Sequence, residues 1–278
     1  MDYAFYNGSV MPYDEAKIPL YDRSVFFGDG VYDCMLGRCG RVFQFTEHMD
    51  RLRKNAGLIS LSLPYSDGEI LDCVNRLIRL SGCTEYTVYV QLSRTAERRC
   101  HTSPDFKKSS LLITVCETSL PRSYERVSLF SFDDIRYRMC NVKTLNLLPN
   151  VLVAERAMEE GADEGVFVRD GIITECSRSN IFAIKSGRII THPESRSILP
   201  GITRKNVLRI AKAVGLLCEE RCFTYDELLS SDGAFITSTT RLVRGVGSVD
   251  GNPISQAYEH VIKTLYSLIL EEYVDFCC

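Results

Sequence analysis

The sequence lacks a basic character, a membrane-length apolar segment and a leader-like beginning. Its 33 Lys and Arg residues are outnumbered by 36 Asp and Glu residues, which gives a formal net charge of −3. Its arginine-rich stretches are short and separated, so we expect no nucleic-acid partner. No apolar run reaches the roughly 20 residues that span a bilayer, and the first residues, MDYAFYNG, do not resemble a signal peptide. We therefore expect a soluble, cytoplasmic protein with no membrane partner.

Metal-binding spacings are also missing, although cysteine is abundant at 12 of 278 residues. The sequence has no C-x-x-C motif, and Cys218 and Cys222 lack histidines at the spacing of a zinc site. We expect no metal site and interpret the cysteines as reduced thiols, mostly small buried hydrophobic residues. A content of 45% hydrophobic and 25% charged residues is typical of a globular chain, and this length can form two modest domains.

Strand and helix signals alternate irregularly, which predicts an α+β fold. Asn7-Gly8 predicts a hairpin turn, and Thr46 is the expected N-cap of a helix that ends at residue 57. The other expected elements are strands at 31–36, 86–92, 111–116 and 234–237, hairpins at 165–175 and 181–191, and helices at 67–81, 149–161, 199–215 and 255–274. A linker at 119–123 predicts a smaller domain over 1–118 and a larger domain over 124–278.

One lysine, Lys143, follows a mostly apolar run and lies just before the helix expected at Pro149. Removal of an amine from water favours its neutral form, and a neutral lysine amine can form a Schiff base with an aldehyde. Taken alone, such a lysine is more often a surface residue whose stem covers apolar groups. The residue is therefore either a nucleophile or an ordinary surface charge.

Other segments offer the groups that a phosphorylated aldehyde cofactor needs. Glu175 ends a predicted strand, and the stretches Gly201–Thr203 and Ser238–Thr240 combine backbone N–H groups with hydroxyls. Arg51, near the start of a predicted helix, is either a solvated charge or an anion clamp. A phosphate site, a Schiff-base lysine and a carboxylate together suggest pyridoxal 5'-phosphate.

Seven motifs occur in one order over nearly the whole chain and resemble the class IV aminotransferases, the fold-type IV pyridoxal-phosphate enzymes. They are FGDGVY (27–32), EHMDRL (47–52), KTLNLLPN (143–150), GADE (161–164), TECSRSN (174–180), LPGITR (199–204) and TSTT (237–240). Within the family, the chain is most similar to the D-amino-acid aminotransferases. The resemblance implies a small α/β domain plus a larger pseudo-barrel domain, pyridoxal 5'-phosphate as cofactor, and a homodimer. It also implies exchange of an amino group between a D-amino acid such as D-alanine and a 2-oxo acid such as 2-oxoglutarate.

The resemblance also implies a role for individual residues. Lys143 would form the Schiff base and carry the proton, Glu175 would hold the pyridine nitrogen protonated, and Leu199 would pack on the ring. Arg51, Ile202, Thr203, Ser238 and Thr239 would bind the phosphate. Tyr32, Arg99 and His101 would bind the substrate carboxylate, the last two from a loop that reaches across the dimer interface in the family.

The family also contains branched-chain L-amino-acid aminotransferases and 4-amino-4-deoxychorismate lyase, which share the lysine, the glutamate and the phosphate loops. The R-x-H pattern at Arg99 and His101, together with LNLLPN, favours the D-amino-acid group over both. A non-catalytic cofactor-binding relative is a third alternative, although Lys143 and Glu175 are present. Cys176 and Thr95 stand where glycine is common in the family, and these two departures leave the substrate preference open but not the cofactor.

Overall fold

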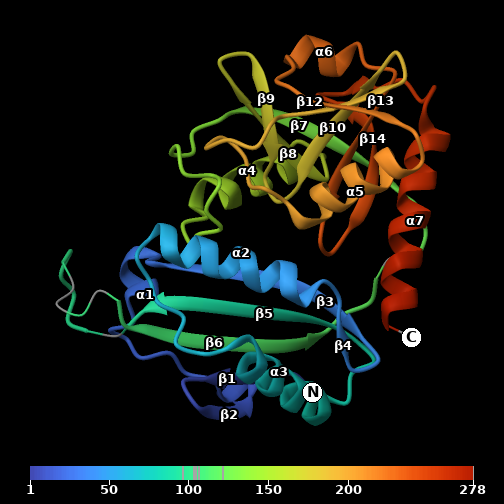
Figure 1. Cartoon of the computed structure of the whole chain (residues 1–278). Helices are drawn as coiled ribbons and strands as arrows, with labels where there is room; N and C mark the ends of the chain where they lie inside the picture. Colours follow the sequence, from blue (N-terminus) through green and yellow to red (C-terminus); the bar gives the residue numbers. More distant parts are fainter. Residues whose placement is uncertain (96, 103–104, 106, 121, 278) are drawn as a thin grey trace. The chain divides into compact units, whose positions relative to one another are not determined.

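The computed structural model describes residues 1–95, 97–102, 105, 107–120 and 122–277 (Figure 1). The chain forms two compact units. The first comprises Met1–Leu120, Val142–Asn146 and Val274–Cys278, and the second comprises Pro121–Asn141 and Leu147–Tyr273. The segment that carries Lys143 is therefore part of the first unit, whereas the domain limits expected from the sequence assigned it to the second.

The first unit is built on a six-stranded sheet in the order β2-β1-β6-β5-β3-β4. Every pair of neighbouring strands in it is antiparallel. Its strands are β1 (Tyr3–Tyr6), β2 (Ser9–Pro12), β3 (Gly30–Arg38), β4 (Arg41–Val42), β5 (Glu85–Arg94) and β6 (Ser109–Glu117). Its helices are η1 (Tyr13–Glu15), α1 (Arg23–Phe27), α2 (Phe45–Leu58) and α3 (Asp67–Ser81).

The core of this unit lies on one face of the sheet, beneath α2 and α3. Side chains alternate between the two faces of a strand, so Val31 and Met35 of β3 point into this core. Asp33 shares their face, and Tyr32 points to the opposite one. This alternation decides which β3 side chains meet α2 and which meet the Lys143 segment.

Helix α3 begins and ends where the sequence predicts. A capping box fixes its start. The Ser66 side chain accepts from the Glu69 N–H, and the Glu69 carboxylate accepts from the Ser66 N–H. The prediction of Thr46 as the N-cap of α2 is wrong. The chain turns through Gln44 at a φ of 52°, so the helix starts at Phe45 and Thr46 lies inside its first turn.

The second unit is built on a nine-stranded sheet in the order β12-β11-β10-β13-β14-β7-β8-β9, with β15 on β14. Its strands are β7 (Arg126–Asp133), β8 (Glu164–Arg169), β9 (Ile172–Cys176), β10 (Asn180–Lys185), β11 (Arg188–Thr191), β12 (Leu217–Glu220), β13 (Gly233–Ser238), β14 (Leu242–Val249) and β15 (Asn252–Pro253). Its helices are α4 (Leu148–Glu159), α5 (Ile202–Ala213), α6 (Tyr225–Leu229) and α7 (Glu259–Cys277). The last residues of α7, from Val274, belong to the first unit. Strand β9, at one end of this order, contacts β10, so the sheet curls back on itself.

The α+β prediction is confirmed, as are the helix that begins near Pro149 and the hairpins β8–β9 and β10–β11. Proline in the first turn suits α4 because the N–H groups there have no partner within the helix. Strands β7, β12, β14 and β15 were not predicted. Within the described residues, no helix combines the length and the apolar character that crossing a membrane requires.

Candidate functional site

The segment around Lys143 pairs with the beginning of β3. Thr144 forms an antiparallel bridge with Val31, and the Lys143 carbonyl oxygen accepts from the Tyr32 N–H at 3.0 Å. A Cβ at position 30 would lie 2.6 Å from the Leu92 carbonyl oxygen and would also meet the side chain from position 145. Glycine at position 30 therefore permits the close approach that fixes the lysine backbone.

The Lys143 side chain lies against aromatic surface. Its Nζ is 4.4 Å from the centroid of the Tyr32 ring, and that ring stacks on Tyr89 with a centroid separation of 5.4 Å. A cation over a ring face is attracted by the ring electrons. Lys143 is half-buried, so it is not the fully solvated surface lysine that the sequence alone left possible.

Arg51 is held by a buried carboxylate that the sequence analysis did not assign. Its Nε donates to the Asp33 Oδ2 at 2.8 Å, and its Nη2 donates to the Oδ1 at 2.7 Å. The His48 Nδ1 lies 2.7 Å from the same Oδ1, and Asp33 is fully buried. Burial alone would raise the pKa of Asp33, but the charge of Arg51 and the bonds from both partners hold it well below its usual value. Arg51 is thus an oriented residue rather than a solvated charge.

The side chains of Arg99 and His101 pack against Phe27 of α1 and not against Tyr32. The Arg99 guanidinium carbon is 5.2 Å from the Phe27 ring centroid, and the His101 ring is 5.5 Å from the same ring. Arg23 fixes their loop by donating to the Cys100 carbonyl oxygen at 2.5 Å. Among the described contacts, none joins Arg99 or His101 to Tyr32.

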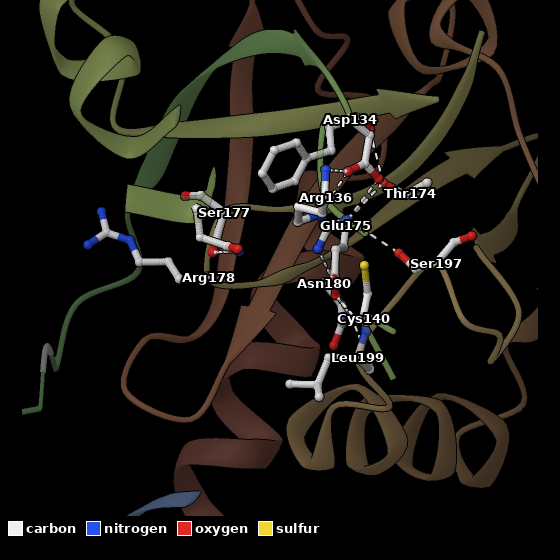
Figure 2. Close-up of polar contacts among 12 residues, drawn as sticks. Asp134, Arg136, Cys140, Thr174, Glu175, Ser177, Arg178, Asn180, Ser197 and Leu199 are labelled. Carbon is white, nitrogen blue, oxygen red and sulfur yellow. Dashed lines mark hydrogen bonds and ion pairs between the residues drawn. The ribbon is translucent and has the colours of Figure 1, made fainter. Parts of the chain in front are cut away.

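In the second unit, Glu175 is a buried carboxylate that accepts from three donors (Figure 2). The Arg136 Nη1 donates to its Oε1 at 2.5 Å. The Asn180 Nδ2 and the Leu199 N–H donate to its Oε2 at 3.1 and 2.9 Å. Burial raises the pKa of Glu175, and the charge of Arg136 opposes that rise. The carboxylate is therefore fixed in position and close to a cation.

Arg136 connects Glu175 to a second buried carboxylate. Its Nε and Nη2 donate to the two Asp134 oxygens at 2.9 and 3.0 Å, and its guanidinium carbon lies 4.1 Å from the Phe167 ring centroid. Burial by itself would lower the pKa of Arg136, but the bond to Asp134 and the charge of Glu175 raise it above its usual value. Arg136 lies 39 residues before Glu175, in a polar stretch without a local motif, and the sequence analysis did not identify it.

The start of α5 lies next to Glu175. The Asn180 Nδ2 also donates to the Leu199 carbonyl oxygen at 2.9 Å. A Cβ on Gly201 would clash with Asn180, so glycine allows α5 to begin beside this amide. No described side chain caps α5, so its first N–H groups, including those of Ile202 and Thr203, face outward from the helix end.

The hydroxyl turn after β13 belongs to the same region. Asn180 of β10 pairs with Thr237 of β13, α5 packs on β13, and Ser238 and Thr239 follow at the strand end. The structure thus brings together the predicted residues of the second unit. They are Glu175, Leu199, Ile202, Thr203, Ser238 and Thr239.

Cys176 points away from this region, because it follows Glu175 on the same strand. It is buried in the hydrophobic core with Val166 and Ile181, and burial raises the pKa of its thiol well above the usual value. Its side chain therefore fills the core and stays protonated. Among the described residues, no group of three or more His, Cys, Asp or Glu side chains is arranged to hold a metal ion.

Comparison with known proteins identifies the family. The family model "Amino-transferase class IV" matches residues 30–249. The chain belongs to the class IV aminotransferases. It is 36% identical over 251 residues to a D-alanine aminotransferase from Bacillus licheniformis, covering 90% of this chain and 89% of that protein. It is 33% identical over 277 residues to a D-alanine aminotransferase from Listeria monocytogenes, covering 98% and 96%. The predicted family and enzyme class are confirmed.

Solved structures show the same fold as this class IV aminotransferase. A branched-chain aminotransferase from Thermoproteus uzoniensis superposes with a TM-score of 0.89 at 23% identity, covering 99% of this chain and 97% of that one. A putative 4-amino-4-deoxychorismate lyase from Legionella pneumophila superposes with a TM-score of 0.85 at 20% identity, covering 92% and 96%. These likenesses confirm the predicted fold type.

Class IV aminotransferases depend on pyridoxal 5'-phosphate, and the residues of this chain fit that group. The second unit offers a buried carboxylate for a pyridine nitrogen and an uncapped helix start beside hydroxyls for a phosphate. The Thr237 Oγ1, next to Ser238, is buried without a hydrogen-bond partner among the described residues. The first unit offers a half-buried lysine amine on an aromatic surface. Each of these groups has the chemistry that one part of the cofactor requires.

Removal of Arg136 should make stability depend on the protonation of Glu175. In Arg136→Met, two buried carboxylates lose a cation, and we expect the free energy of unfolding to fall by about 3–5 kcal/mol at neutral pH. Without Arg136, the folded-state pKa of Glu175 rises further above its unfolded value. The deficit should therefore be larger at pH 7.5 than at pH 5, as measured by urea unfolding.

Two further variants complete this test of the Arg136–Glu175 pair. Adding Glu175→Gln to Arg136→Met should recover part of the loss, because an amide carries no charge to bury. Arg156→Met, on the exposed surface of α4, should change stability by less than about 0.5 kcal/mol. A deficit that does not vary with pH and is not reduced by Glu175→Gln would contradict the pairing.

The Asp33 network predicts a second dependence on pH. Because the pKa of Asp33 is lower in the folded than in the unfolded chain, its contribution is complete above the unfolded value of about 3.9 and is lost as the pH falls below it. Burial lowers the pKa of His48 in the folded chain. The stability of the folded chain therefore also falls, through His48, as the pH drops below about 6.5. Asp33→Asn should lower the free energy of unfolding at pH 7 by about 3–5 kcal/mol and flatten its decline between about pH 5 and 3. Exposed Asp72→Asn is the control, and an equal decline in wild type and Asp33→Asn would exclude Asp33 as its source.

Proposed function

We propose that this class IV aminotransferase exchanges an amino group between a D-amino acid, such as D-alanine, and a 2-oxo acid, such as 2-oxoglutarate. The observation that carries the proposal is the similarity, over nearly the full length of both chains, to proteins named D-alanine aminotransferase, at 33–36% identity. The likenesses to branched-chain aminotransferases and to the lyase lie at 20–23% identity and support the fold alone.

Pyridoxal 5'-phosphate, when bound, supplies an electron sink for negative charge that develops at the substrate α-carbon. We assign proton transfer at that carbon to the Lys143 Nζ, whose backbone is fixed on β3 and whose amine is partly shielded from water. We assign to Glu175 the hydrogen bond that holds a proton on the pyridine nitrogen. A carboxylate fixed by three donors suits this role because it needs no reorientation during the reaction.

We assign the phosphate to Arg51, to the first N–H groups of α5 at Ile202 and Thr203, and to the hydroxyls of Ser238 and Thr239. Support for Arg51 is its orientation by Asp33, and support for the others is the uncapped helix start beside the hydroxyl turn. Leu199, whose N–H is bound to Glu175, would pack against the ring.

We assign the substrate carboxylate to Tyr32, Arg99 and His101. A guanidinium can bind a carboxylate through two parallel bonds. Within this chain, the described contacts join Arg99 and His101 to Phe27 and not to Tyr32. This suits a loop that serves the second subunit of a homodimer, so we include the homodimer in the proposal. A cytoplasmic location also remains part of the proposal, supported by free thiols at ten of the described cysteines.

The half-reaction with an amino donor tests the proposed substrate. Protein loaded with pyridoxal 5'-phosphate is titrated with D-alanine, L-alanine and L-leucine in the absence of a 2-oxo acid, while the absorption spectrum is recorded. We expect D-alanine alone to remove the yellow absorption of the bound cofactor, and 2-oxoglutarate to restore it. The physical reason is that the carboxylate-binding residues select which face of the substrate α-carbon is presented to the lysine.

The other outcomes of this titration point to the alternatives. Conversion by L-leucine would move the protein to the branched-chain group. A yellow protein that no donor changes would favour the lyase or a non-catalytic relative, and only the lyase would turn over an aminodeoxychorismate substrate without a 2-oxo acid.

The assignment of Lys143 is tested by substitution. Lys143→Ala should lower transamination by about a hundredfold or more, because no other assigned group can move the proton at the α-carbon. Borohydride reduction followed by peptide mass spectrometry should find the cofactor on the Lys143 peptide of the wild type. Lys54→Ala, an exposed lysine on α2, should retain both properties. Substantial transamination by Lys143→Ala would refute the assignment.

A further inference from the structure

The second unit contains a cysteine–histidine pair outside the residues assigned above. Strands β11 and β12 are parallel neighbours in which Thr191 lies opposite Glu220. Parallel strands end at the same edge of a sheet, so the residues that follow them, His192 and Cys222, come close together. The Cys222 Sγ lies 3.6 Å from the His192 Nε2, within hydrogen-bonding distance for sulfur.

The tautomer of His192 follows from its second contact. The Nδ1 lies 2.8 Å from the carbonyl oxygen of Pro193. A carbonyl oxygen can only accept, so the Nδ1 carries a hydrogen, and in the neutral ring the Nε2 offers its lone pair to the Cys222 S–H. A nucleophile, a base in contact with it and a third group that orients the base are the parts of an activated thiol.

The surrounding charges favour the neutral ring. Burial lowers the pKa of His192, and the positive charges of Arg204 and Arg169 lower it further, although the bond to the backbone works in the opposite sense. The Arg204 Nη2 donates at 2.8 Å both to the His192 carbonyl oxygen and to Glu220, and Glu194 lies 3.7 Å from the Nη1. The His192 ring is therefore neutral at neutral pH, and its Nε2 lone pair can accept the proton of Cys222.

Accessibility distinguishes the two members of the pair. Cys222 is exposed, whereas only 6% of His192 is exposed. A reagent in solution can reach the sulfur while the base behind it stays shielded. Cys39 and Cys100 are also exposed, but Cys100 bonds to the Thr102 hydroxyl instead of to an imidazole.

We propose that Cys222 is a thiol–disulfide exchange site for small disulfides, with His192 as its base. The sulfur attacks one sulfur of the disulfide while its proton passes to the His192 Nε2. A new S–S bond forms to Cys222, the S–S bond of the reagent breaks, and the departing thiolate takes the proton from His192. Cys222 is oxidised and the small disulfide is reduced, so no other redox partner is required.

The test uses the reduced full-length protein and oxidised glutathione as the probe. Mixed-disulfide formation is followed at each cysteine by peptide mass spectrometry. At pH 7, Cys222 should react about tenfold or more faster than Cys39. An unassisted thiol loses thiolate about tenfold per pH unit below its pKa, so the ratio of the two rates should grow as the pH falls from about 8.5 to 7. Equal rates, or a ratio that does not change with pH, would overturn the proposal.

The variant His192→Gln separates the base from simple exposure. It should lower the rate at Cys222 to that of Cys39 in the same sample, while the rates at Cys39 and Cys100 stay within about twofold of wild type. A rate at Cys222 that is unchanged in His192→Gln would refute the role of the histidine. Circular dichroism checks that the variant is folded, and the wild-type ratio decides the question if it is not.

Discussion

The buried ion pair between Arg136 and Glu175 is the constraint on which the second unit depends. A carboxylate removed from water is stable only with charged and hydrogen-bonding partners, and Glu175 has a guanidinium, an amide and a backbone N–H. Each of these donors comes from a different part of the chain. To satisfy one side chain, the loop after β7, the strand β10 and the approach to α5 must therefore meet at the end of β9.

In the first unit, too, a buried carboxylate depends on hydrogen bonds from an arginine. Asp33 is a charge on the core face of β3, where its neighbours on that face, Val31 and Met35, are apolar. It is tolerated because α2 brings His48 and Arg51 against it. The arginine is thereby held in one orientation, which reduces the conformational entropy that binding of an anion would cost, as the proposed phosphate contact requires. In both units, then, a buried carboxylate and the arginine that donates to it stabilise each other.

Local signals explain which elements could be predicted. The helix at 67–81 and the hairpin at 165–175 are each specified by residues within them or directly beside them, so both were predicted from the sequence. The capping box at Ser66, which the sequence analysis did not identify, is also local to its helix. Strand β14 was missed because Gly245 and Gly247 interrupt its pattern, and β12 because it is short and half exposed. Some of their pairing partners lie far away in the sequence. A strand whose formation depends mainly on the strands that it pairs with has only a weak strand pattern in its own residues.

The residues of the candidate site likewise fall into those with a local sequence motif and those without one. The motifs that surround Lys143, Glu175 and the start of α5 were recognisable because their spacing is local. Arg136 was not, because the Asp134-x-Arg136 pair is no recognisable motif by itself, and its other carboxylate partner, Glu175, lies 39 residues away in the sequence. Strand alternation determines where the adjacent side chains of Glu175 and Cys176 point. Glu175 faces its donors, and Cys176 faces the hydrophobic core. Cysteine is therefore accommodated at position 176 with its thiol among apolar side chains, and it does not displace Glu175 from its three donors.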